Sequence, residues 1–321
     1  MTRSDKSVGS NSPVILMDQQ NTLKGSASFQ GKGLHTGAFV HLTINPAPVD
    51  YGFRFKRVDL DGQPEIPALA TRVSFTQRGT VLTGDNRETV STIEHLMSAL
   101  RARGVDNCCI ELDGPEVPIL DGSAKPFVDA IDNVGLQQQD AERRYLCIGH
   151  KVVYEEKEKG LRIIALPEEY FAAEVAIAFD GTRCLANQWA QIEDLGTEYD
   201  QIYDCRTFVF LHEIAPLLNM GLIKGGDLDN AIVFVEGELS GEQRSELARK
   251  LGREDVTIHA SGVLNDRDLK YANEAARHKL LDLIGDLALV GMPIKGRILA
   301  TRSGHGSNTA FARQLMQEFL K

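Results

Sequence analysis

The first half of the chain shows a strand-like pattern of apolar and polar positions, followed by a helical one. Residues 40–44 and 52–58 alternate with the period of two that is typical of β-strands. Over residues 89–103 the apolar side chains instead recur at spacings of three and four, which predicts an amphipathic helix. A buried strand at 107–112 and a second helix with Ser123 as its N-cap are predicted to follow.

The second half repeats this order of elements. Several strand patterns precede a charged helix and then the strongest helix of the second half, after which come one more strand and a short terminal helix. The strands are predicted at 151–154, 161–166, 173–179, 231–235 and 296–301, and the two helices at 240–252 and 273–290. The sequence therefore predicts an α+β fold in which one unit of strands and helices occurs twice.

Two polar segments suggest where the chain divides. Residues 1–20 are rich in Ser, Asn, Asp and Gln, which predicts a disordered N-terminal tail. The segment 137–144, QQQDAERR, has no apolar periodicity and is interpreted as a domain boundary. We therefore expect a first α+β domain at 21–140 and a second at 145–321.

The composition argues against nucleic acid as a partner and against membrane insertion. The formal net charge is -10 and no basic stripe is present, so an anionic substrate would need a few local cations. No apolar run approaches the roughly 18 residues of a membrane-spanning helix, and no signal peptide is evident. The five cysteines form no CxxC pair, which predicts free, buried thiols in the reducing cytoplasm.

Candidate chemistry first appears in the predicted helix at 273–290. At roughly 100° per residue, His278, Asp282 and Asp286 form a stripe opposite the apolar side of this helix. A His and an Asp four residues apart can bind one cation together. A solvated helix face would produce the same stripe, and spacing alone favours that alternative.

The predicted helix at 89–103 carries complementary groups. His95 lies away from the apolar face of this helix, and Glu94 precedes it. His95, His278 and Asp282 would supply three ligands and leave a fourth position open, which is the pattern of catalytic zinc. Glu94 would then be a carboxylate suited to general base catalysis.

A further histidine follows the last predicted strand. His305 lies between Gly304 and Gly306, which is also a common sequence for a plain turn. Together with the stripe, His305 would be a general acid or oxyanion partner, and Asp286 would keep it protonated and oriented.

Several long segments match the motifs of one enzyme family. They are GKGLHTG at 31–37, STIEHLMSAL at 91–100, DGPEVPILDGSA at 113–124, CRTFVF at 205–210, LIKGGDLDNAIV at 222–233, RHKLLDLIGDL at 277–287 and SGH at 303–305. With these motifs the chain resembles the UDP-3-O-acyl-N-acetylglucosamine deacetylases of lipid A synthesis, and the resemblance extends over nearly the whole chain after the tail.

This resemblance implies two α+β domains of similar topology, each a sheet layered with helices, with the active site between them. It also implies a role for each candidate residue. The zinc ligands would be His95, His278 and Asp282, the base Glu94, the acid His305 oriented by Asp286, the oxyanion partner Thr207, and the substrate contacts Phe208 and Lys279.

The substrate implied by the resemblance is a UDP-sugar lipid precursor. The apolar segment 208–224 matches the family's insert, which forms a passage for the acyl chain. The long segment 236–270 resembles the form of the enzyme that is fused to a hydroxyacyl-carrier-protein dehydratase, so a dehydratase domain is a possible partner. After SGH the family often has an Asn–Lys pair, whereas this chain continues with Asn308, Thr309 and Ala310.

Two other functions fit the same residues. A binding protein would keep the sugar-nucleotide pocket without turnover. A different zinc amidohydrolase would show no dependence on an acyl chain. Two histidines and one aspartate also accept iron or cobalt in place of zinc.

Overall fold

The computed structural model describes residues 18–179, 185, 187–219, 224–264 and 267–320. The predicted disordered tail lies outside these residues except at its end, because Gln19 and Gln20 begin strand β1 (Gln19–Leu23). The described chain contains helices and several sheets, and the predicted α+β class is confirmed.

The first half of the chain forms a five-stranded sheet whose central strand comes last in the sequence. The strand order is β2 (Ala27–Lys32), β3 (Phe39–Pro46), β9 (Cys108–Leu112), β4 (Phe53–Arg57) and β5 (Glu65–Pro67). Strand β9 is antiparallel to β3 and parallel to β4. Buried apolar residues alternate with more exposed ones along β3 and β4, so one face of this sheet packs on the core.

The second half forms a sheet of the same topology. Its strand order is β12 (Val152–Glu156), β13 (Leu161–Leu166), β18 (Ile294–Thr301), β14 (Phe171–Ile177) and β15 (Gln188–Ile192), and β11 (Leu146–Cys147) adds to β18. The last strand, β18, is again central, antiparallel to β13 and parallel to β14. The two halves therefore contain the same arrangement of strands, as the repeated sequence pattern predicts.

Two smaller sheets correct the sequence analysis. A three-stranded sheet is formed by β6 (Val73–Phe75), β7 (Val81–Thr83) and β8 (Thr89–Ser91). Because β8 takes up the start of the helix predicted at 89–103, this helix begins five residues later than predicted, at Glu94. The polar segment 137–144 mostly forms strand β10 (Leu136–Glu142), which pairs with β1. Most side chains of β10 are at least partly exposed, so this strand needs no apolar face and its pattern gives no sign of a strand. The domain limits at 140 and 145 stay predictions.

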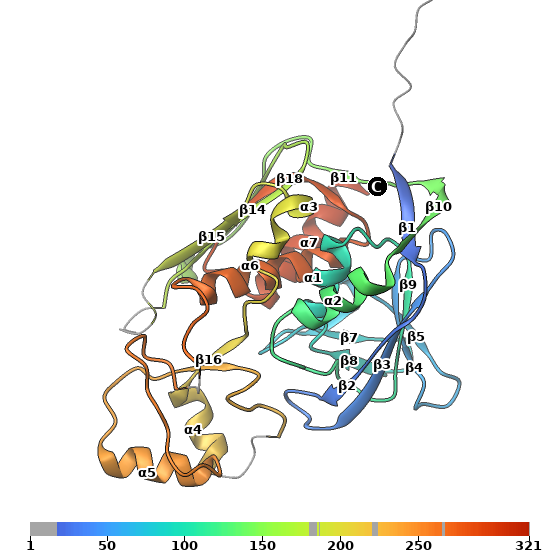
Figure 1. The fold of residues 1–321 in the computed structure, drawn as a ribbon. Helices are drawn as coiled ribbons and strands as arrows, with labels where there is room; N and C mark the ends of the chain where they lie inside the picture. The colour runs from blue at the N-terminus through green and yellow to red at the C-terminus, as the bar shows by residue number, and fades with distance from the viewer. Residues whose placement is uncertain (1–17, 180–184, 186, 220–223, 265–266, 321) are drawn as a thin grey trace, which may run out of the picture.

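The helices pack between and beside the sheets (Figure 1). Helix α2 begins one residue later than predicted, with Ala124 as N-cap, although the Ser123 hydroxyl still accepts a hydrogen bond from the Lys125 amide. The helices are α1 (Glu94–Ala102), α2 (Lys125–Val134), α3 (Leu195–Glu198), α4 (Leu211–Asn219), α5 (Gly241–Lys250), α6 (Glu274–Leu287) and α7 (His305–Phe319).

Helices α4 and α5 belong to a separate lobe with its own small core. Figure 1 shows the two helices at the lower left, below the second sheet. Strands β16 (Phe208–Phe210) and β17 (Ile232–Phe234) pair in parallel and connect the lobe to the rest of the molecule. Apolar residues including Leu228, Val235 and Leu247 are buried together within the lobe.

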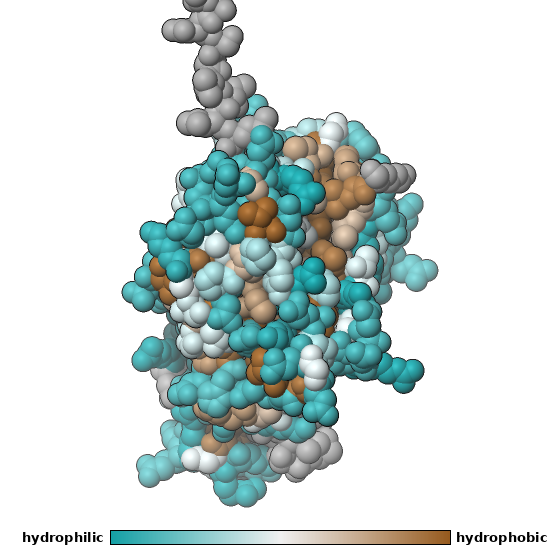
Figure 2. Space-filling view, turned by 90° about the vertical axis from the view of Figure 1, so that its right-hand side faces the viewer, coloured by the Kyte–Doolittle hydropathy of each residue, from teal (hydrophilic) through white to brown (hydrophobic). Residues whose placement is uncertain are grey.

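The surface carries few features that change this picture. The face in Figure 2 is largely hydrophilic, with a band of hydrophobic residues toward its upper right. None of the described helices is long and apolar enough to cross a membrane.

The described cysteines are free, as predicted, but Cys147 is exposed and Cys109 only half-buried, so burial was wrongly predicted for them. Cys184 lies outside the described residues.

Helices α1 and α6 are in close contact, and this contact positions the candidate site. A Cβ atom on Gly285 would lie 2.0 Å from the backbone oxygen of Glu94, so only glycine allows the observed approach. His278, Asp282 and Asp286 are 1%, 2% and 0% exposed. The alternative of a solvated face on α6 is therefore wrong.

Replacing Gly285 tests this contact. Gly285→Ala should lower the free energy of unfolding by about 1–3 kcal/mol, because the added methyl overpacks the helix crossing. Urea unfolding followed by circular dichroism measures the change. Gly241→Ala is the control, since a Cβ at this position meets nothing within 4 Å. Equal stability of both variants would contradict the proposed tight crossing.

Candidate metal centre

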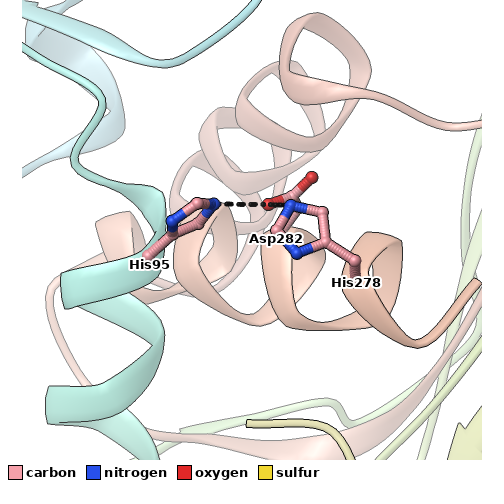
Figure 3. A group of neighbouring side chains, drawn as sticks. All are labelled: His95, His278 and Asp282. Atoms are coloured by element: carbon pink, nitrogen blue, oxygen red, sulfur yellow. Dashed lines mark ion pairs between the residues drawn. The ribbon is translucent and has the colours of Figure 1, made fainter. Parts of the chain in front are cut away.

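Three ligand-type side chains from α1 and α6 point toward one another (Figure 3). His95 lies in the first turn of α1, whereas His278 and Asp282 lie on consecutive turns of α6. Each of the three offers one ligand atom, and these atoms lie within 4.8 Å of one another. Asp282 Oδ1 is 3.7 Å from His95 Nε2 and 3.4 Å from His278 Nε2. The three side chains can hold a metal ion.

The hydrogen bonds within the described structure favour a metal at this position. The Cys205 carbonyl oxygen lies 3.0 Å from His278 Nδ1, which makes Nδ1 the donor and leaves a lone pair on Nε2. Both His278 Nε2 and Asp282 Oδ1 are buried without a hydrogen-bond partner. A buried polar atom without a partner is costly, and a bound cation would satisfy both atoms.

The electrostatic surroundings hold the three groups in their ligand forms. Burial, together with the nearby His278, lowers the pKa of His95 to about 3, and burial also lowers the pKa of His278. Burial raises the pKa of Asp282, but the nearby His278 and Lys279 lower it by more, so the net shift of this pKa is downward. A neutral imidazole and an ionised carboxylate are the forms in which these side chains bind a divalent ion.

Glu94 lies beside this group, at the start of α1. The residue is 3% exposed, and Glu94 Oε2 accepts a hydrogen bond of 3.1 Å from the backbone amide of Thr80. Burial raises the pKa of Glu94 to about 7, with Asp282 adding to the rise and His305 opposing it. A carboxylate with a pKa near neutrality is suited to accept and release a proton.

His305 begins α7 and faces Glu94 across the site. Its Nδ1 is 2.9 Å from Asp286 Oδ2, and its Nε2 is 3.9 Å from Glu94 Oε1. Burial lowers the pKa of His305, but Asp286 and Glu94 outweigh burial and raise it to about 9. The raised pKa favours the protonated imidazolium near neutral pH, and Nε2 is directed into the site.

Lys279, Phe208 and Thr207 border the same group. Lys279 Nζ donates to Asp282 Oδ2 at 2.8 Å and lies 5.5 Å from the centre of the Phe208 ring. The amide of Thr207 donates to the Gly122 carbonyl at 2.8 Å, which ties this residue to the loop before α2. The structure thus brings every candidate residue named from the sequence to one place.

A cavity of about 610 Å³ opens from these residues toward the lobe of α4 and α5. Its polar part includes Glu94, His95, His278, Asp282 and His305. Its apolar part includes Phe179, Phe208, Phe210, Ile214, Val233 and Leu251, and the cations Arg78, Lys159 and Lys224 also line it. One cavity therefore joins a candidate metal site, basic side chains and an apolar wall.

The sequence analysis missed residues that hold the site together. These residues are Thr80 and Asn308. Thr80 Oγ1 donates to the fully buried Asp286 at 2.6 Å, and Asn308 Nδ2 donates to it at 3.0 Å, besides the contact of Asp286 with His305. Asn308 lies three residues after His305 on α7, so helical spacing could have found it. Thr80 is distant in sequence and gives no such signal.

The fold and site together define an α+β protein with two sheets of equal topology, whose central helices carry a buried His, His and Asp group that can hold a metal ion. The chain belongs to the UDP-3-O-acyl N-acetylglycosamine deacetylase family, whose profile matches residues 20–251 and 243–317. The resemblance found in the sequence motifs is thereby confirmed.

Relatives of this chain include single and bifunctional enzymes. It is 50% identical to the bifunctional enzyme LpxC/FabZ of Bacteroides thetaiotaomicron and 48% identical to that of Porphyromonas gingivalis, over 94% of this chain in both cases. It spans 65% of the length of these two relatives. It is 40% identical to the UDP-3-O-acyl-N-acetylglucosamine deacetylase of Phenylobacterium zucineum, over 92% of each chain.

Metal content tests the three-residue site. His278→Ala should reduce bound metal from about one ion per chain to near zero, because two ligands cannot match the affinity of three. Elemental analysis after gel filtration measures the ratio. His150→Ala is the control, since His150 is exposed and pairs with Glu318. Full metal content in His278→Ala would refute the assignment.

Proposed function

We propose that this chain is a zinc-dependent amide hydrolase. It removes the N-acetyl group from UDP-3-O-(3-hydroxyacyl)-N-acetylglucosamine and releases acetate, as a step of lipid A biosynthesis. Family membership supports the substrate class, and the convergence of Glu94, His305 and the three ligand-type residues supports the chemistry. A cytoplasmic location stays a prediction from the sequence.

His95, His278 and Asp282 would hold the zinc ion. A bound zinc ion supplies Lewis-acid polarisation of the acetamide carbonyl and lowers the pKa of nearby water. Three protein ligands leave a coordination position open, as catalytic sites require. The Cys205 carbonyl orients His278, and Lys279 holds the second oxygen of Asp282.

Glu94 would act as the general base. Its carboxylate lies next to the ligand group and is held by the Thr80 amide, so it can take a proton from water that attacks the acetamide carbon. The pKa of about 7 lets Glu94 both accept this proton and release it later in the reaction.

His305 would act as the electrostatic partner and general acid. Its protonated imidazole faces the centre of the site, where it can stabilise the negative charge that develops on the carbonyl oxygen. The hydroxyl of Thr207 would assist at this oxygen. When the C–N bond breaks, the proton of His305 passes to the leaving amine, which leaves acetate and the free amino sugar.

The cavity would bind the rest of the substrate. Lys279 and Phe208 would contact it near the reacting amide, and other cations of the cavity would offset the diphosphate charge. The apolar wall includes Phe210 and Ile214 of the segment 208–224, which supports the proposal that this segment forms a passage for the acyl chain. The part of this segment at 220–223 lies outside the described residues.

The proposal also covers the two domains and a possible partner. A first domain at 21–140 and a second at 145–321 would each contribute a helix to the site. The name LpxC/FabZ of the bifunctional relatives supports a dehydratase as a possible partner.

Acetate release tests the proposed reaction. The zinc-loaded protein should release one acetate per acylated UDP-N-acetylglucosamine and act far more slowly on the sugar without the acyl chain. Glu94→Gln should lower kcat by about 10²- to 10⁴-fold, because the base is lost while the side chain keeps its shape. Binding without acetate release by the wild type would favour a non-catalytic binding protein. Equal rates with and without the acyl chain would favour a different amidohydrolase.

The pH profile tests the roles of Glu94 and His305. The plot of kcat/KM should be bell-shaped, because Glu94 must be ionised and His305 protonated. The charge of a bound metal ion lowers both pKa values, so the limbs should lie below about 7 and about 9. His305→Gln should lose the falling limb. A wild-type rate that still rises above pH 9 would contradict these assignments.

A further inference from the structure

A residue outside every sequence motif links two of the acidic groups of the site, Glu94 and Asp286. Thr80 is fully buried at the end of the loop that leads into β7. Its backbone amide donates to Glu94 Oε2 at 3.1 Å, and its hydroxyl donates to Asp286 Oδ1 at 2.6 Å. The two carboxylates come from α1 and α6, and Thr80 binds both.

Contacts outside these two helices also hold Thr80 in position. Strand β7 begins at the next residue and pairs with β8, with Val81 opposite Ser91. On the other side, the Arg78 carbonyl contacts His35 Nε2 at 2.9 Å. A Cβ on Gly79 would lie 3.2 Å from Glu94 Oε1, so the loop passes directly over the carboxylate. Thr80 is therefore a fixed point against which both carboxylates are oriented.

The hydroxyl of Thr80 determines which oxygen of Asp286 remains for His305. Because Asp286 Oδ1 accepts from Thr80, the other oxygen, Oδ2, accepts from His305 Nδ1 and Asn308 Nδ2. Without the hydroxyl, Oδ1 would be a buried carboxylate oxygen that lacks this donor, and the carboxylate would rotate to regain one. Any such rotation moves the imidazole of His305 relative to Glu94.

We propose that Thr80 is a positioning residue that sets the separation of the base Glu94 from the acid His305. The inference rests on the proposed hydrolase function. Thr80 does not line the cavity, whose described lining residues include Thr76 and Arg78. Its loss should therefore affect the chemical step more than substrate binding.

Three substitutions in the full zinc-loaded chain test the proposal. Thr80→Val keeps the size of the side chain and removes the hydroxyl, and it should lower kcat by about 10- to 100-fold with KM changed by less than about twofold. Thr80→Ser keeps the hydroxyl and should restore kcat to within about threefold of the wild type. Thr22→Val is the control, because it removes another buried hydroxyl whose donation to the Asn107 carbonyl is remote from the site.

Metal content and thermal unfolding accompany the kinetics. The proposal requires that Thr80→Val keep its zinc and that Thr22→Val keep its kcat. Equal loss of kcat in Thr80→Ser and Thr80→Val would overturn it, since packing would then matter and the hydroxyl would not. Unchanged kcat in Thr80→Val, loss of its zinc or failure of this variant to fold would overturn it as well. A wild type that releases no acetate would instead refute the proposed function.

Discussion

The close crossing of α1 and α6 is the constraint on which the site depends. Gly285 allows the backbone of α6 to reach the first turn of α1, and that turn carries Glu94 and His95. Because the α6 ligands lie on turns immediately before Gly285, one contact between helices brings two imidazoles and a carboxylate together. The equal topology of the two sheets supports this arrangement, since each half supplies one of the crossing helices.

The site carries an electrostatic cost that the rest of the structure must offset. Glu94, Asp282 and Asp286 are almost completely buried near one another, and burial of carboxylates opposes their ionised forms. Lys279 and His305 partly neutralise them, and Thr80 and Asn308 donate hydrogen bonds. His278 Nε2 and Asp282 Oδ1 are buried without a hydrogen-bond partner, and a bound cation would supply one to both. A large hydrophobic core, continuous across both halves, stabilises the fold around this group.

Local features of the site could be predicted from the sequence, whereas features that depend on the fold could not. The spacing of His278 and Asp282 on one helix follows from helical periodicity, and the strand at 161–166 follows from alternation. Burial of the stripe on α6 could not be deduced, because exposed and buried polar faces have the same period. Val90 matches a helical spacing but lies in β8, because a strand of only three residues is too short to show a clear alternation of apolar and polar positions. Thr80 reaches Asp286 only through tertiary structure, across 206 positions of sequence.

The central claim is that helices from both halves hold one metal ion between them. Anomalous diffraction at the zinc absorption edge, from crystals of the zinc-loaded protein, tests it most directly. One peak should lie at about 2.0–2.2 Å from a nitrogen of His95, a nitrogen of His278 and an oxygen of Asp282. A peak bound by α6 alone, with His95 turned away, would contradict the account.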